Sequence, residues 1–272
     1  MADSPSINIS IRFQGGIAAS NRLDMYDGAA SLFGLSKAFL ISSHFLINEK
    51  IVFQAPAASG VRCFLLTSRP GSWDQAIQIV IDNKEFLLGV GAATAKDILK
   101  DFTKVVLTHG VGRPVKAATS YVRDLLNRKK SEFEVLTEAT GGSLRDAHRT
   151  IEPDGTTSVR LRSDGERLVT LNAETWRYVT DFVREDRTRE VVGNISSYNV
   201  NSRRGRIYDS DLGRTVPFVL DKGISNRARI ATTWSLDRRN NGVDGDVIAT
   251  VTRELTINRE VRRYIVHNVR HA

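Results

Sequence analysis

The chain has 272 residues, a length that favours two domains, and its 41% hydrophobic and 26% charged residues are typical of globular proteins. The single cysteine excludes an internal disulfide and any cysteine-rich zinc site. The formal net charge of +8 favours polyanionic partners such as nucleic acid, nucleotides or anionic lipid surfaces. We expect no membrane span and a cytoplasmic protein, because no signal-peptide pattern opens the chain and no segment reaches the roughly 20 uncharged apolar residues of a transmembrane helix.

The balance of basic residues predicts two modules. Residues 1–150 carry nine lysines and nine arginines against 14 acidic residues, whereas residues 151–272 carry one lysine and 20 arginines against 17. Arginine suits planar, bidentate contacts to phosphate and stacking on bases. Three clusters of turn-forming residues place the boundary within 140–170: Gly141-Gly142, Pro153-Asp154-Gly155 and Ser163-Asp164-Gly165. We therefore predict an α+β domain over 1–150, a linker with a short helix over 151–188 and an arginine-rich barrel over 189–272.

The N-terminal module begins with a strand, because apolar and polar residues alternate strictly over 7–13. A long segment over 29–47 follows that is apolar nearly all round, which predicts a helix buried on most sides or packed against another subunit. Further strands are expected at 51–54, 61–67 and 76–81, with Pro70-Gly71 turning between the last two.

Helical spacing then predicts two helices, over 98–105 and 118–125, with Pro114 in the first turn of the second. The N-terminal module is therefore interpreted as a mostly antiparallel sheet with helices packed against it.

The C-terminal module is predicted to be a small OB-like barrel of five strands. Asn172 is expected to cap a short helix that carries Trp176, Val179, Phe182 and Val183 on one side. Three strands, a helix over 224–236 and two strands then give the chain order of an OB-fold. A sixth strand over 230–236 is the alternative to that helix, because apolar residues also alternate there. The five strands are expected at 190–197, 205–210, 215–220, 246–254 and 262–269.

The loops of this barrel carry the candidate ligand-binding residues. OB-folds bind ligands on their second and third strands and on the first and last inter-strand loops. Tyrosines there could stack on bases, and the arginines could converge into one anion-attracting concavity. The candidate nucleic-acid-binding residues are Tyr198, Arg203, Arg204, Arg206, Tyr208, Arg253, Arg259, Arg262 and Arg263.

Three short strings, Arg12-Phe13-Gln14-Gly15-Gly16, Leu23-Asp24-Met25-Tyr26-Asp27 and Gly193-Asn194-Ile195-Ser196, resemble an uncharacterised bacterial two-domain family. The resemblance implies an N-terminal domain of unknown function followed by a C-terminal five-stranded β-barrel, over most of the chain. It implies no catalytic residue.

Catalytic and metal-binding patterns are weak, and we expect neither a cofactor nor a metal. Residues 89–96 begin like a dinucleotide-binding loop but lack its third glycine and its acidic partner. Asp82-Asn83-Lys84 with Asp74 has the local form of a metal-dependent nuclease site, and Asp24 with Asp27 could bind a cation. The five histidines show no ligand spacing, and Cys63 is interpreted as a structural thiol.

The leading hypothesis is a non-enzymatic binding protein whose barrel contacts nucleic acid or a nucleotide while the N-terminal domain mediates assembly. The alternative is a structural or interaction subunit of a larger bacterial complex, self-associating or binding a partner protein through the apolar helix at 29–47. A metal-dependent hydrolase using Asp82 and Lys84, or Asp24 and Asp27, is the lesser alternative.

Overall fold

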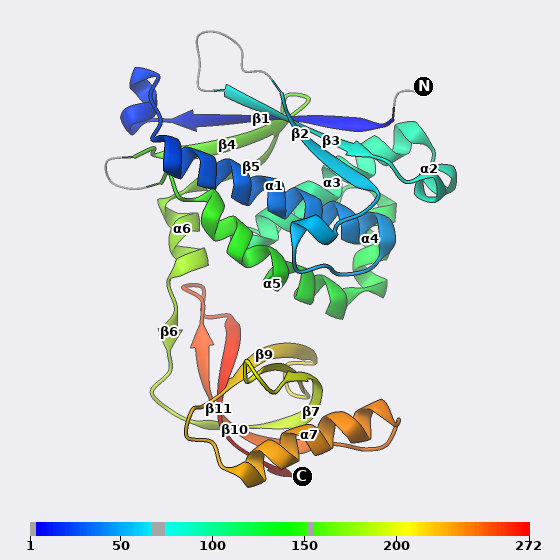
Figure 1. Ribbon diagram of the computed structural model, residues 1–272, viewed down its shortest axis with the longest axis vertical. Coiled ribbons are helices and arrows are strands. Elements are labelled where there is room, and N and C mark those ends of the chain that lie inside the picture. Colours follow the sequence, from blue (N-terminus) through cyan, green and yellow to red (C-terminus); the bar gives the residue numbers. More distant parts are fainter. Residues whose placement is uncertain (1–3, 67–73, 152–154) are drawn as a thin grey trace. The chain divides into compact units, whose positions relative to one another are not determined.

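The computed structural model describes residues 4–66, 74–151 and 155–272. The chain divides into two compact units, Met1–Thr180 and Asp181–Ala272 (Figure 1). The first is an antiparallel sheet with helices and the second is a closed barrel, so the α+β prediction is confirmed.

The N-terminal unit is built on a five-stranded sheet in the order β2-β3-β1-β4-β5, in which every pair is antiparallel. The side chains of Ile7, Ile9 and Ile11 alternate with exposed residues and are fully buried, as the sequence predicted. The strands are β1 (Ser6–Gln14), β2 (Val61–Leu66), β3 (Asp74–Ile81), β4 (Ser158–Ser163) and β5 (Glu166–Asn172).

The described residues of this unit form six α-helices, and the longer ones lie on one side of the sheet (Figure 1). Helix α1 packs on α5 and α3, and α3 also contacts β5 and β1, so that one continuous apolar core forms between helices and sheet. The helices are α1 (Met25–Asn48), α2 (Lys84–Val90), α3 (Ala92–Gly110), α4 (Ser120–Arg128), α5 (Lys130–Ala147) and α6 (Ala173–Thr180).

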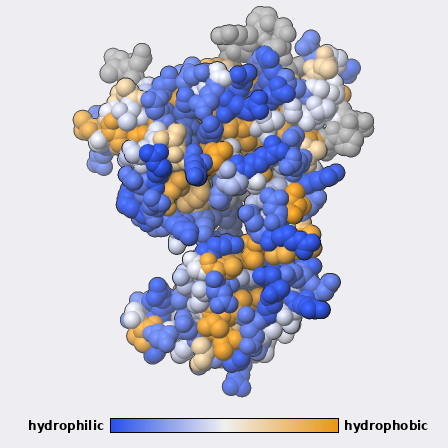
Figure 2. Space-filling view, turned by 180° about the vertical axis from the view of Figure 1, so that it is seen from behind, coloured by the Kyte–Doolittle hydropathy of each residue, from blue (hydrophilic) through white to orange (hydrophobic). Residues whose placement is uncertain are grey.

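Helix α1 is the apolar segment that the sequence predicted, and its own unit buries most of it. Leu35, Phe39 and Phe45 are fully buried. Among the described residues, α1 is also the one helix long and apolar enough to cross a membrane, whereas the sequence predicted no membrane span. Most of its residues are buried inside the unit, as in a core helix of a folded domain. The contacts with α3 and α5 thus cover most of the apolar surface of α1 for which a partner subunit was predicted. Figure 2 shows one face of the protein, on which apolar residues form separate patches among hydrophilic ones.

Two local predictions for this unit are wrong. Residues 51–54 form no strand; they precede a short 3₁₀ helix (Ala55–Ala57) whose Pro56 has no N–H to donate to a sheet. Pro114 lies outside α4, which begins only at Ser120, because the buried carboxylate of Asp101 accepts hydrogen bonds from the backbone N–H groups of Ala118 and Thr119 (3.0 and 2.7 Å). The predicted Pro70-Gly71 turn lies outside the described residues.

The predicted boundary near residue 150 also differs from the structure. Gly141-Gly142 lies inside α5, and residues 158–180, assigned to a linker, form β4, β5 and α6 of the first unit. The physical reason is that β4 pairs with β1 (Ile9 opposite Ser163), which completes the sheet with the last strands of the unit. The predicted short helix and its cap are present: Asn172 Oδ1 accepts from the N–H groups of Glu174 and Thr175 (3.1 and 3.0 Å). The helix ends at Thr180, before the predicted Phe182 and Val183, because Val183 pairs with Leu255 in a short strand of the second unit.

The C-terminal unit is a barrel closed by five strands in the order β7-β8-β9-β11-β10, with β10 pairing back to β7. All of these pairs are antiparallel except β9–β11, which is parallel. A two-residue strand, β6 (Val183–Arg184), extends the sheet beside β10. The barrel strands are β7 (Arg189–Asn199), β8 (Arg204–Asp209), β9 (Arg214–Leu220), β10 (Val247–Leu255) and β11 (Val261–His271). The predicted five-stranded barrel is confirmed.

A single helix, α7 (Asn226–Asn240), connects β9 to β10, so the alternative strand over 230–236 is wrong. Ser225 caps the helix by accepting from the N–H of Ala228. Ala228, Ala231 and Ser235 lie at helical spacing and are buried against the barrel, and this packing selects the helix over the competing alternation.

A buried hydrogen bond links β11 to the end of β8. The Tyr264 hydroxyl donates to Asp209 Oδ2, and Asp209 Oδ1 accepts from the N–H groups of Asp211 and Leu212 (2.9 and 3.0 Å) in the β8–β9 turn. Burial, with the neighbouring Asp209 carboxylate, raises the pKa of Tyr264, which therefore remains a donor over the ordinary pH range.

We expect Tyr264→Phe to lower the free energy of unfolding of the barrel by about 2 kcal/mol, because it leaves a buried carboxylate without one charge-assisted hydrogen bond. The loss of stability is measured by urea titration of the full chain, with hydrogen exchange followed in the proteolytic peptides that come from the barrel. Tyr208→Phe is the matched control, since Tyr208 is 38% exposed. An equal effect of the two variants would contradict the role of the Asp209 hydrogen bond.

Candidate functional site

The outer surface of β8 presents two arginines and a tyrosine in a row. Arg204, Arg206 and Tyr208 alternate with Gly205 and the buried Ile207, so their side chains leave the barrel on the same face. Directly paired residues of β7 and β9 share this face. None of the nine residues in the three paired rows is acidic: Asn194, Ser197, Asn199, Arg204, Arg206, Tyr208, Thr215, Pro217 and Val219.

The β7–β8 loop adds Arg203 to one end of this row. Asn199 Oδ1 accepts from the N–H groups of Asn201 and Ser202 (both 3.0 Å), which closes the loop tightly. Arg203 has a left-handed backbone (φ 56°), and its guanidinium donates to the carbonyl of Lys222 (3.1 Å). The neighbouring Arg204 is exposed and makes no ion pair within the described chain. The row therefore ends in an exposed guanidinium with no acidic partner.

Tyr198, predicted to stack on bases, packs instead with the barrel core. Its ring stacks on Phe218 at 6.1 Å between centroids, and the two residues lie on either side of Gly205 in the sheet. A side chain at 205 would meet the Phe218 ring, so glycine is required for this packing. We leave Tyr198 out of the candidate interface.

The arginines around the β10–β11 loop are largely held by intramolecular contacts. Arg253 donates twice to Glu185 (both 2.7 Å), and this interaction lowers the pKa of Glu185 to about 2. Arg263 donates to Glu254 (2.9 and 2.5 Å). Arg262 lies over the Phe182 ring at 3.9 Å, and Arg259 has a left-handed backbone. The first two already have carboxylate partners and are poor candidates for binding phosphate.

The nine predicted residues therefore do not converge into one concavity. Arg204 pairs with Val219 near the end of β9, whereas the β10–β11 loop lies near its start, where Arg214 donates to the Val261 carbonyl (2.6 Å). A seven-residue strand spans roughly 20 Å, so the two arginine groups lie at opposite ends of β9. The candidate interface is reduced to Arg203, Arg204, Arg206 and Tyr208.

The weak catalytic and metal patterns have structural roles. Asp74 accepts two hydrogen bonds from Arg12 (2.7 and 2.6 Å), Asp82 pairs with Arg62, and Asn83 caps α2. Residues 89–96 join α2 to α3 and contain no strand.

Asp24 caps α1, and Asp27 pairs with Arg149 (3.2 Å). Burial raises the pKa of Cys63, which disfavours the thiolate. No group of three His, Cys, Asp or Glu side chains suited to a metal ion occurs in residues 4–66, 74–151 and 155–272.

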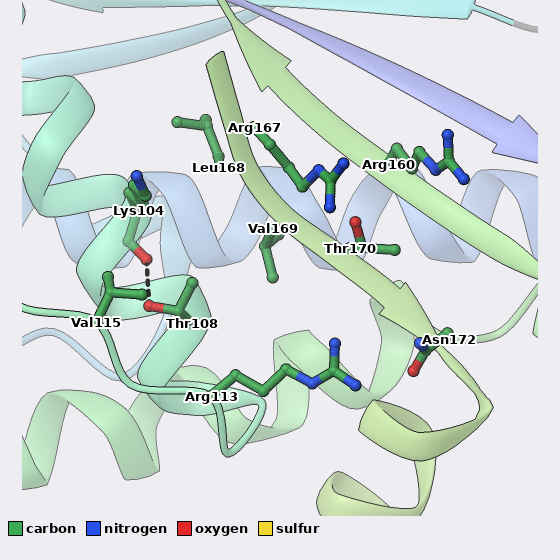
Figure 3. A pocket seen from close by; sticks show the side chains of 10 residues that line it. All are labelled: Lys104, Thr108, Arg113, Val115, Arg160, Arg167, Leu168, Val169, Thr170 and Asn172. Carbon is green, nitrogen blue, oxygen red and sulfur yellow. Dashed lines mark hydrogen bonds between the residues drawn. The ribbon is translucent and has the colours of Figure 1, made fainter.

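A second basic site lies in the N-terminal unit, and the sequence reasoning missed it. A pocket of about 430 Å³ opens beside the edge strand β5 (Figure 3). The available signal was the pair Arg160 and Arg167 on either side of a Ser163-Asp164-Gly165 turn, which indicates a hairpin; those residues were assigned to a linker. The lining residues are Lys104, Thr108, Arg113, Val115, Arg160, Arg167, Leu168, Val169, Thr170 and Asn172.

Comparison with known proteins identifies the two units as separate families. Residues 9–180 match the model of a domain of unknown function, DUF7946, and residues 187–270 match a family of unknown function, DUF7947. No curated protein and no solved structure gives a significant match. The residue ranges of the two family matches agree with the two structural units, and the expected two-domain layout is confirmed. The chain belongs to the DUF7946 family, and its barrel matches the DUF7947 family over residues 187–270.

Proposed function

We propose that the C-terminal barrel binds single-stranded nucleic acid along the outer face of β8. The observation that carries this proposal is the row Arg204, Arg206 and Tyr208 on a face whose paired strands present no acidic side chain. The exposed guanidinium of Arg204, which has no acidic partner among the described residues, attracts phosphate, and the exposed Tyr208 ring offers a stacking surface to a base.

The fold also favours β8 as the strand that binds the nucleic acid. β8 and β9 are the second and third strands of an OB-like barrel, and this face of OB-folds binds oligonucleotides and oligosaccharides. The arginines favour the anionic polymer over the neutral one. The short row and the single exposed ring indicate a contact of only a few nucleotides.

The test is fluorescence anisotropy of the full chain with labelled 20-nucleotide oligo-dT and oligo-U at several salt concentrations. We expect affinity to fall steeply with salt, because each neutralised phosphate releases counterions. Arg204→Gln should weaken binding several-fold and reduce the slope of log K against log salt by about 0.7, the value for one phosphate of a single strand.

Arg229→Gln is the matched control, because Arg229 is exposed on α7, which packs mainly on β7 and β11. It removes the same charge from the barrel and should leave the slope unchanged. Salt-independent binding, or equal slopes for the two variants, would refute a phosphate contact at Arg204.

A further inference from the structure

The pocket in the N-terminal unit lies along an edge strand and is bounded by four elements. β5 is the outermost strand of the sheet, and Leu168, Val169 and Thr170 of this strand form one wall. Arg160 of the neighbouring strand β4, the second half of α3 and the loop that follows α3 form the rest. Figure 3 shows the guanidinium groups of Arg167 and Arg113 on either side of the Val169 and Thr170 side chains.

The lining of this pocket is strongly positive. It contains Lys104, Arg113, Arg160 and Arg167 and no acidic residue. Lys104 and Arg113 are partly neutralised by carboxylates outside the lining, Glu166 and Glu174. Arg160 and Arg167 form no ion pair with any residue that the structure describes. At least two positive charges are therefore available to a ligand in this pocket.

Neutral polar groups lie among these charges. Thr170 Oγ1 is buried and has no hydrogen-bond partner in the described part of the chain. The side-chain oxygen of Asn172, Oδ1, caps α6, so the amide nitrogen of the same side chain does not take part in the cap. A buried hydroxyl without a partner is uncommon in folded proteins and often marks a place where a ligand or water completes the structure.

We propose that this pocket binds a small molecule carrying two or more phosphate or carboxylate groups. Arg160 and Arg167, which form no ion pair among the described residues, would bind the anionic groups, since each guanidinium offers a bidentate fork. The volume of about 430 Å³ is that of a small-molecule site. No aromatic residue lines the pocket, so nothing there would stack on a nucleobase, and Val115 and Val169 suit a short aliphatic or sugar backbone.

Isothermal titration calorimetry of the full chain tests this, with pyrophosphate, citrate and inorganic phosphate as probes. We expect one pyrophosphate or citrate to bind per chain, at least about tenfold more tightly than inorganic phosphate, because a second anionic group adds a charge-assisted contact. The pyrophosphate and citrate arms distinguish a phosphate ligand from a carboxylate ligand. Equal affinity for pyrophosphate, citrate and inorganic phosphate would overturn the proposal, as would no binding of any of them.

Substitutions locate the site. Arg160→Gln and Arg167→Gln should each weaken binding about tenfold, whereas Arg145→Gln, which removes an exposed charge from α5, should not. Both pocket arginines are exposed, so these variants should fold, which circular dichroism checks. Arg167→Lys keeps the charge without the fork and should lie between wild type and Arg167→Gln. An equal loss in Arg145→Gln would show general charge attraction and refute the pocket.

The same variants separate this inference from the proposed function. Arg160→Gln and Arg167→Gln should retain oligonucleotide binding, and Arg204→Gln should retain pyrophosphate binding, because the residues belong to different units. Loss of both activities in any one of these variants would contradict the assignment of two independent anion sites.

Discussion

The Gly193→Ala variant is expected to lose about 3 kcal/mol or more of the free energy of unfolding of the barrel, the largest effect of any substitution considered for this unit. Strand β7 changes partner at this residue: residues 189–193 pair with β10, and residues 193–199 pair with β8. A Cβ atom at 193 would lie 1.7 Å from the backbone oxygen of Tyr208. That contact is possible only if β7 and β8 separate, which breaks the ladder at the bend that closes the barrel.

Urea denaturation of the full chain, with hydrogen exchange resolved by peptide, measures this loss in the barrel alone. Gly223→Ala is the matched control, because the Cβ added there meets only an Asp221 side-chain oxygen at an ordinary distance of 3.5 Å. It should change stability by less than about 1 kcal/mol. If Gly193→Ala were as mild as the control, the close approach at Tyr208 would not constrain the barrel.

The N-terminal unit is expected to lose about 2 kcal/mol of stability between pH 7.5 and pH 5, and about 3 kcal/mol by pH 4, through His148 alone. Burial of this fully enclosed side chain lowers its pKa from 6.5 to about 4, against the opposing effect of its hydrogen bond to the Leu144 carbonyl. Because the folded state has the lower pKa, the unfolded chain binds a proton first as the pH falls below 6.5. Stability is therefore complete above about pH 6.5 and is lost progressively down to about pH 4.

The geometry explains why His148 stays neutral. Nδ1 lies 2.7 Å from the Leu144 carbonyl and must donate to it, which leaves Nε2, 2.9 Å from Thr175 Oγ1, as an acceptor. A second proton would replace that acceptor with a donor and place a charge in the core.

Peptide-resolved hydrogen exchange in urea at pH 7.5 and pH 5 measures the loss in the N-terminal unit. His148→Gln removes the titrating group, so the difference between the two pH values should shrink even though the variant is less stable at both. Glu185, whose pKa is about 2, lies in the other unit and loses its contribution only below pH 4.5. A pH dependence in His148→Gln equal to that of wild type would refute the assignment.

The candidate interface was predicted from the sequence only in part. The sequence predicts a strand over 205–210 with Arg204 in the preceding loop, and the structure begins this strand, β8, at Arg204. Which arginines are already paired is not local: Arg253 meets Glu185, 68 residues earlier in the chain, across β10 and the segment after β6. The composition gives the number of arginines but not their partners. The basic surface predicted around the β10–β11 loop was therefore too large.

The pocket could not be predicted for a related reason. Its positive side chains come from α3, the loop after it, β4 and β5, and only the folded unit brings Arg113 and Arg167 to the lining of one pocket. Arg160 and the β5 residues of the lining lie within 151–188, the span predicted to be a linker and short helix, so no pocket was expected there.

The sequence by itself determined the elements whose patterns are local: the first strand, the long apolar helix and the barrel strands with their connecting helix, because periodicity and capping act over a few residues. Only the tertiary structure decided the unit boundary, because β4 pairs with β1 across about 145 residues of chain. It also decided that Gly141-Gly142 is helical, because Leu136 and Leu144 of the same helix pack in the core. Long-range pairing and burial outweigh weak local preferences of this kind, and they also decide which charges remain free to bind.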